Sequence, residues 1–213
     1  MIQAGKTVLA SRVVEECCKI PQARTAFFYC RHTDEDRNPF VAVARTVLSQ
    51  LIAGNDTILQ LLHDHAANSG EAVLSSCNAA KSLLETALKT CDKAQKTYII
   101  IDGLDEYNRE SRKEISTWFK ERIRDVPTND LGQIRCLFVS QDDGYARKDL
   151  SDCSSIKLTP KDTQSDIESF CKMWHNLISQ KFGPLDPKEH KISEIVTARA
   201  QGDSELSIIQ SSR

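Results

Sequence analysis

A cluster of acidic residues directly after a run of isoleucines offers the clearest chemistry in this sequence. Residues 99–106 read Ile-Ile-Ile-Asp-Gly-Leu-Asp-Glu, so that Asp102, Asp105 and Glu106 bring three carboxylates within about one turn of chain. An unbroken apolar run of this kind is typical of a strand buried on both faces. Carboxylates gathered beside such a strand can hold a divalent metal or polarise a water molecule. The alternative is a strand that ends in a solvated acidic turn.

A second informative group opens the chain, where Gly5, Lys6 and Thr7 precede an apolar helical pattern. This order is the second half of a phosphate-binding loop, G-x-x-x-x-G-K-[ST]. The glycine lets the backbone approach phosphate, the lysine reaches the β- and γ-phosphates, and the threonine hydroxyl binds Mg²⁺. The amino end of the following helix adds free N–H groups and the positive end of its dipole. Together with Asp102, about 95 residues later, these residues predict a nucleoside-triphosphate site.

The phosphate-binding loop is incomplete in this sequence. Its first glycine falls one position ahead of Met1, and the strand that leads into such a loop falls there too. We therefore expect a sheet that lacks one strand, in a fragment of a larger gene product.

Alternating strands and helices are predicted to position these residues. Four strands alternate with helices up to residue 158, which indicates a parallel sheet covered on both faces. Such sheets bind ligands at the carboxyl ends of their strands. The strands are expected at Ala23–Cys30, Thr97–Ile101, Ile134–Ser140 and Ser155–Leu158. The helices are expected at Thr7–Lys19, Phe40–Ala53, Thr57–His65, Ala79–Cys91, Asn108–Asp125, Tyr145–Leu150, Asp162–Lys181 and Lys188–Ala200.

Side-chain patterns give further expectations for two of these helices. Trp118 is expected in the core rather than at a stacking surface. In the helix Asp162–Lys181, the apolar residues expected to point inward are Ile167, Phe170, Cys171, Trp174 and Ile178.

Composition narrows the class of protein. Charged residues make up 27% of the chain and the net charge is −2, with no basic stripe, so general attraction to nucleic acid or to an anionic membrane is not expected. No run approaches the roughly 20 apolar residues that a membrane-spanning helix needs. The eight cysteines show neither C-x-x-C pairs nor a zinc-site spacing. Buried thiols in a reducing compartment are favoured over disulfides, and a cytoplasmic location is expected.

Three segments together resemble a known family: Gly5-Lys6-Thr7, the acidic strand at 99–106, and Leu137-Phe138-Val139-Ser140-Gln141. They resemble the NACHT branch of the P-loop ATPases, and more closely the nephrocystin-like N-terminal P-loop domain of fungal NOD-like receptors. The similarity covers roughly residues 3 to 202. It implies an α/β, three-layer parallel sheet of the P-loop NTPase type, here lacking its first, central strand. It also implies ATP or GTP with Mg²⁺ as ligands, and a nucleotide-driven switch for self-assembly in signalling.

The resemblance assigns roles residue by residue. Lys6 and Thr7 match the phosphate and Mg²⁺ contacts, and Asp102 matches the acid on the Mg²⁺ side. Asp105 or Glu106 matches the carboxylate that orients the attacking water. Ser140 matches a sensor position beside the γ-phosphate, together with Gln141. Family members often carry arginine after this serine, whereas Gln141 brings no charge to stabilise a transition state.

The resemblance also divides the chain. Residues 1–159 are expected to form a truncated nucleotide-binding domain, residues 160–202 a helical lid or hinge, and residues 203–213 a polar tail outside the family pattern. The resemblance implies effector and repeat domains in a longer protein, and we expect them to lie outside this sequence. Two hypotheses follow: a nucleotide-binding switch module that self-associates, or a degenerate, non-hydrolysing domain that acts only as an interaction module or has no function.

Overall fold

Three parallel strands form the centre of the structure: β1 (Ala23–Tyr29), β2 (Lys96–Asp102) and β3 (Ile134–Gln141). In register, Phe28 lies beside Ile101, and Ile101 beside Phe138. The structure, a computed structural model, describes residues 6–31, 38–53, 55–69, 76–91, 95–124, 133–141, 143–183 and 206–211. The predicted helix at 188–200 lies outside these residues.

Two more strands complete the sheet, whose order is β1-β2-β3-β5-β4. Strand β5 (Leu206–Ser211) runs antiparallel to both β3 and β4 (Ser154–Leu158), so β4 runs in the same direction as β1, β2 and β3. Residues 203–213 were expected to form a polar tail because of their serines and acids, but β5 lies within them. The apolar, partly β-branched residues Leu206, Ile208 and Ile209 favour a strand.

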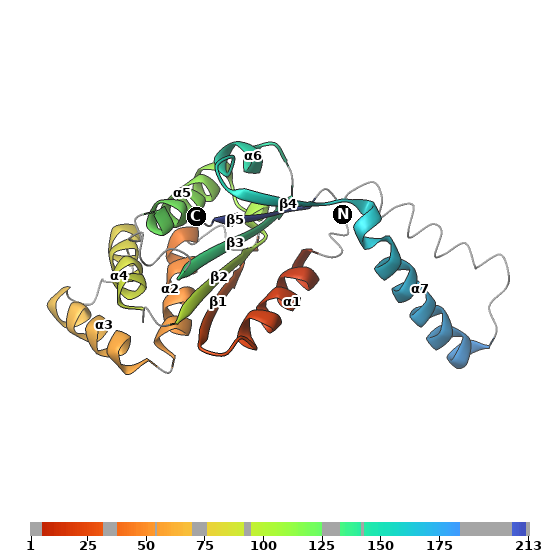
Figure 1. Ribbon diagram of the computed structural model, residues 1–213, viewed down its shortest axis with the longest axis horizontal. Coiled ribbons are helices and arrows are strands. Elements are labelled where there is room, and N and C mark those ends of the chain that lie inside the picture. Colours follow the sequence, from red (N-terminus) through yellow and green to blue (C-terminus); the bar gives the residue numbers. More distant parts are fainter. Residues whose placement is uncertain are drawn as a thin grey trace.

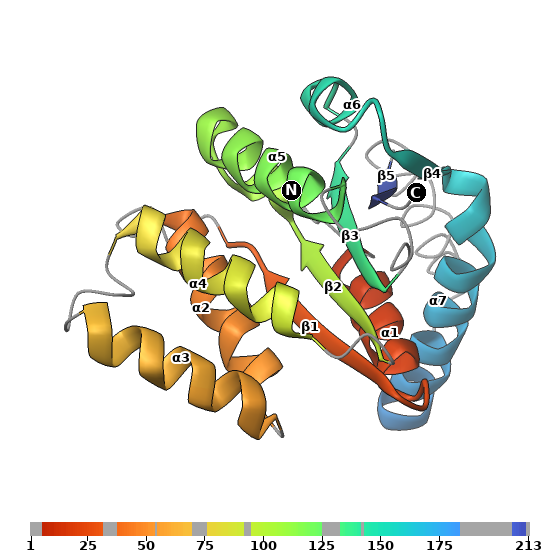
Figure 2. The ribbon, with the colours of Figure 1, turned by 60° about the vertical axis from the view of Figure 1, so that its left-hand side comes forward.

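Helices cover the two faces of the central strands unequally. Figures 1 and 2 show α1 on one face and α2, α4 and α5 on the other, with α3 outside α2 and α4. In β2, Ile99 and Ile101 join the larger core beneath α2, α4 and α5, while Ile100, also buried, points to the face of α1. The helices are α1 (Lys6–Cys18), α2 (Pro39–Ile52), α3 (Asp56–Ser69), α4 (Cys77–Thr90), α5 (Arg109–Arg124), α6 (Tyr145–Asp149) and α7 (Pro160–Phe182), with the 3₁₀ turn η2 (Leu104–Glu106).

The larger core is closed by a row of aromatic rings. Trp118 packs edge-on against Phe40 and Phe119, and Phe119 packs edge-on against Phe138. Trp118 is 8% exposed, which confirms the prediction that it belongs to the core. All eight cysteines are free thiols, but only Cys30 and Cys136 are buried, whereas buried thiols were expected throughout.

Helix α7 differs from its prediction in the direction of its side chains. Phe170 and Trp174, expected to point inward, are 58% and 48% exposed, while Cys171 and Ile178 are half-buried. The side chain of Ile167 is not among those that the structure describes. Figure 1 shows α7 projecting away from the sheet, so the sheet does not cover its apolar face. Over the part of the chain that the structure describes, no helix is both long and apolar enough to cross a membrane.

Candidate functional site

A left-handed turn at Gly103 brings the acidic residues to the carboxyl edge of the sheet. Gly103 has a φ of 73° and its N–H donates to the carbonyl oxygen of Val139 on β3. A Cβ at this position would meet the carbonyl oxygen of Cys30 at 3.2 Å. Any residue with a side chain would therefore be strained in conformation and crowded against Cys30, the residue directly after β1. Glycine lets the chain leave β2 and turn at once into η2, which carries Asp105 and Glu106.

Helix α1 begins at this same edge and presents its first two side chains to the acids. The Nζ of Lys6 donates to Oδ2 of Asp105 at 2.7 Å, and both side chains are only 7% exposed. The hydroxyl of Thr7 donates to Oδ2 of Asp102 at 2.9 Å. The structure thus brings together residues about 95 positions apart, as the sequence predicted. Gly5, the remaining residue of the predicted loop, lies outside the described residues.

Asp102 carries an unsatisfied oxygen. The residue is 3% exposed, and its Oδ1 has no hydrogen-bond partner. Burial raises the pKa of the Asp102 carboxyl, against the opposite effects of the Thr7 hydrogen bond and of nearby Lys6. A buried carboxylate oxygen without a partner fits a role as a ligand of a hard cation such as Mg²⁺. Within the described ranges no three acidic, histidine or cysteine side chains form a full metal-binding group. A cation here would take further ligands from the Thr7 hydroxyl, water or a bound anion.

Replacing Asp102 with asparagine is expected to stabilise the ligand-free protein at pH 7. Because burial raises the folded-state pKa of Asp102, the native protein binds more protons than the unfolded chain between the two pKa values. Stability falls as the pH rises through that window, and the loss is complete above the folded-state pKa. A neutral amide costs less to leave unpaired, so Asp102→Asn is expected to gain about 1 kcal/mol, or about 2–4 °C in Tm.

Thermal unfolding at two pH values tests this expectation. The advantage of the asparagine variant should disappear below the ordinary carboxyl pKa of 3.8, where Asp102 is neutral in both states. Glu110→Gln, an exposed carboxylate-to-amide change on α5, should shift Tm by less than about 1 °C. A lower Tm for Asp102→Asn at pH 7 would contradict the assignment of Asp102 as a destabilised carboxylate.

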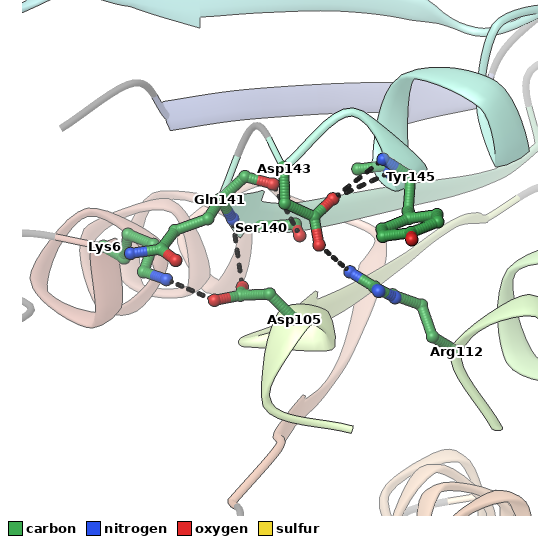
Figure 3. A network of polar contacts seen from close by, with 8 residues as sticks. Lys6, Asp105, Arg112, Ser140, Gln141, Asp143 and Tyr145 are labelled. Atoms are coloured by element: carbon green, nitrogen blue, oxygen red, sulfur yellow. Dashed lines mark hydrogen bonds and ion pairs between the residues drawn. The ribbon is translucent and has the colours of Figure 1, made fainter. Parts of the chain in front are cut away.

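The second oxygen of Asp105 reaches the end of β3. Its Oδ1 accepts a hydrogen bond from the backbone N–H of Gln141 at 3.0 Å, so Asp105 joins α1 to β3 (Figure 3). Ser140 is fully buried and its hydroxyl donates to the carbonyl oxygen of Gln141. Glu106 lies in the same turn as Asp105 and is half-buried. Of the predicted catalytic and sensor positions, Asp105 and Gln141 are joined directly by this hydrogen bond.

A buried ion pair that was not predicted from the sequence lies next to this group. Arg112 of α5 is 6% exposed and donates to Oδ2 of Asp143 at 2.5 Å. Oδ1 of Asp143 accepts hydrogen bonds from the backbone N–H groups of Tyr145 and Ala146, and these bonds fix the start of α6 (Figure 3). Burial opposes the ionisation of Asp143, but the Arg112 hydrogen bond and these two N–H groups lower its pKa. The pair holds the segment after β3 in place, and no spacing in the sequence pointed to it.

Cys30, the residue directly after β1, also adjoins the acids, and it was not predicted as part of the site. Burial raises the pKa of its thiol well above the usual value, and the negative charges of Asp102, Asp105 and Glu106 raise it further. The thiol therefore stays protonated and acts as an apolar wall of the site. Its place at the end of a strand adjacent to β2 was the available signal.

A family model matches more than half of this chain. The family model described as Nephrocystin 3, N-terminal matches residues 2–141, which include every candidate site residue from Gly5 to Gln141. Strand β4, helix α7 and strand β5 lie beyond the matched residues. Neither a curated protein nor a solved structure matches the chain.

Proposed function

The chain belongs to the nephrocystin 3 N-terminal family, and from this premise we propose that it binds a nucleoside triphosphate, ATP or GTP, together with Mg²⁺. One observation carries the proposal. A lysine and a threonine at the amino end of α1 meet two aspartates at the carboxyl edge of the sheet, through contacts of 2.7 Å and 2.9 Å. That combination of a helix amino end, a cation, a hydroxyl and carboxylates suits a phosphate with its counter-ion.

Each of these residues has a definite role in the proposed complex. Lys6 neutralises phosphate charge, and Thr7 and Asp102 hold the cation, to which Asp102 offers its unpartnered oxygen. The bound cation supplies Lewis-acid neutralisation of the phosphate oxygens. Asp105 or Glu106 orients a water molecule, and Ser140 and Gln141 respond to the terminal phosphate from the end of β3. Gln141 is uncharged and gives no cationic stabilisation to hydrolysis.

The resemblance to the NACHT branch of P-loop ATPases extends the proposal to the role of a signalling switch. In this role the bound nucleotide changes the contacts of Lys6 and Asp105, and through Gln141 the end of β3. The support is the pair of bonds that Asp105 makes, one to α1 and one to β3. In the cytoplasm, effector and repeat domains such as those of NOD-like receptors would then respond to these changed contacts.

A second candidate function is favoured by one specific observation. Lys6 and Asp105 already satisfy each other in a buried ion pair, as expected of a degenerate domain that keeps these residues for its structure alone. Such a domain would act only as an interaction module, or would have no function of its own. The two candidates differ in whether a nucleotide can displace Asp105 from Lys6.

Titration calorimetry with ATP and with GTP in the presence of Mg²⁺ tests the proposal. We expect saturable binding of one nucleotide per chain, and weaker binding of the monophosphate, which lacks the phosphates that Lys6 reaches. Absence of binding of either triphosphate to the folded protein would contradict the proposal and favour the degenerate domain.

Replacing Asp105 with asparagine is expected to strengthen nucleotide binding in the absence of Mg²⁺. The Asp105 carboxylate competes with phosphate for Lys6, and after displacement it stays as a poorly solvated negative charge near the triphosphate. The asparagine variant removes both penalties, so ATP affinity measured in excess EDTA should rise about tenfold, which corresponds to about 1.4 kcal/mol.

The neighbouring acid provides the matched control for this prediction. Glu106→Gln removes one negative charge from the same turn without removing the partner of Lys6. The ATP affinity of this variant should therefore differ from that of the unmodified protein by less than about threefold. If Asp105→Asn binds ATP no more tightly than the unmodified protein does, Asp105 does not compete with the nucleotide for Lys6.

A further inference from the structure

Helix α7 presents an apolar stripe to solvent. Phe170, Met173, Trp174 and Leu177 are between 48% and 58% exposed. Their spacing of i, i+3, i+4 and i+7 places them on one face of the helix, and the rings of Phe170 and Trp174 touch edge-on with centroids 6.1 Å apart. Exposed apolar side chains scattered singly are normal, whereas four on a single helix face indicate a surface that binds a partner.

Charged residues stand at the two ends of this stripe. Asp166 lies one turn before Phe170 and Lys181 lies one turn after Leu177, and both are exposed. By helical spacing they share the face of the apolar residues. The stripe therefore has a negative charge at its amino end and a positive charge at its carboxyl end. A partner helix that matches it needs apolar residues flanked by the same charges in the opposite order.

We propose that this partner is α7 of a second copy of the chain, packed in antiparallel orientation. A two-fold axis midway between residues 173 and 174 sets Met173 level with Trp174 of the second copy. The same axis sets Phe170 level with Leu177, and Asp166 level with Lys181. Every apolar residue of the stripe then meets an apolar residue, and both ends of the contact carry an opposite-charge pair. A single two-fold axis produces all of these matches, as a self-complementary interface requires.

The parallel arrangement is disfavoured by the same residues. It would set Asp166 beside Asp166 and Lys181 beside Lys181, with repulsion at both ends. An antiparallel pair of single helices buries less surface than a standard interface, so the association is expected to be weak and to depend on protein concentration. This self-association uses residues of α7 alone and does not require bound nucleotide.

Charge reversal tests the orientation and the register together. In sedimentation equilibrium of the full chain without nucleotide, the mass should rise from 23.9 kDa towards twice that value as the concentration increases. Lys181→Glu alone and Asp166→Lys alone should each weaken the dimer about tenfold, because each converts two attractions into two repulsions. The double variant Asp166→Lys with Lys181→Glu restores both pairs with their charges exchanged. Its dimer should match that of the unmodified chain within about threefold.

Two further measurements make every outcome decisive. Trp174→Ala should abolish the dimer, and circular dichroism of each variant should show unchanged helix content, since all three positions are exposed. A chain that stays monomeric at every concentration would overturn the proposal, as would a dimer that is insensitive to these changes or a double variant that fails to recover. If another part of the same chain covers the stripe, the chain will stay monomeric at every concentration.

Discussion

Nucleotide affinity is expected to fall by about a hundredfold when Lys6 is replaced with alanine. The ammonium group is the only cationic side chain that the described residues bring to Asp105, and the proposed complex transfers it to phosphate. Without it, the carboxylate of Asp105 stays unpaired near the triphosphate and repels it. Titration calorimetry with ATP and Mg²⁺ measures the loss directly.

Two further variants separate the loss of the cation from its side effects. Lys19→Ala removes an exposed lysine just after the same helix, where it pairs with Glu16, and should leave affinity unchanged within about threefold. Lys6→Ala combined with Asp105→Asn removes both partners of the buried pair, so that no charge is left uncompensated. If Lys6→Ala binds ATP as tightly as the unmodified protein does, Lys6 is not a phosphate contact.

Removing the ring of Phe119 is expected to cost about 3–5 kcal/mol of unfolding free energy. Phe119 is 1% exposed on the inner side of α5, and it packs edge-on between Trp118 at 4.9 Å and Phe138 at 6.5 Å, measured between ring centroids. Phe119→Ala loses these contacts and leaves a cavity between α5 and the sheet that close packing cannot fill. Denaturant unfolding followed by circular dichroism measures the difference.

The matched control makes the same chemical change at an exposed position. Phe182 is 74% exposed at the end of α7, so Phe182→Ala should cost less than about 0.5 kcal/mol. Equal losses for the two variants would show that the aromatic row does not form the core of this chain.

The succession of strands and helices could be predicted from the sequence because local patterns determined it. The isoleucine run predicted β2, and the periodic apolar residues of α2, α4 and α5 predicted the helices that cover it. Boundaries shifted by only a few residues in most elements, as for α5, expected to begin at Asn108 and found to begin at Arg109. The largest shift is in α3, which continues to Ser69, because nothing in its polar second half signals an end.

The meeting of Lys6, Thr7 and Asp102 at one edge could also be predicted, since parallel strands deliver their carboxyl ends to the same side of a sheet. Which of these side chains pair with one another in the absence of ligand could not be predicted. The pairing of Lys6 with Asp105 rather than Asp102 depends on the left-handed turn at Gly103, which sets the direction of η2. Likewise, the antiparallel entry of β5 between β3 and β4 depends on contacts between distant segments that carry no local signal.

The dependence of nucleotide affinity on Mg²⁺, compared between the unmodified protein and Asp102→Asn, tests the central claim most directly. That claim is that Lys6, Thr7 and Asp102 line one site for a metal-bound nucleoside triphosphate. ATP should bind the unmodified protein at least about tenfold more tightly with Mg²⁺ than in EDTA, whereas the asparagine variant should bind ATP equally under both conditions. The same Mg²⁺ dependence in both proteins, or none in either, would contradict the claim.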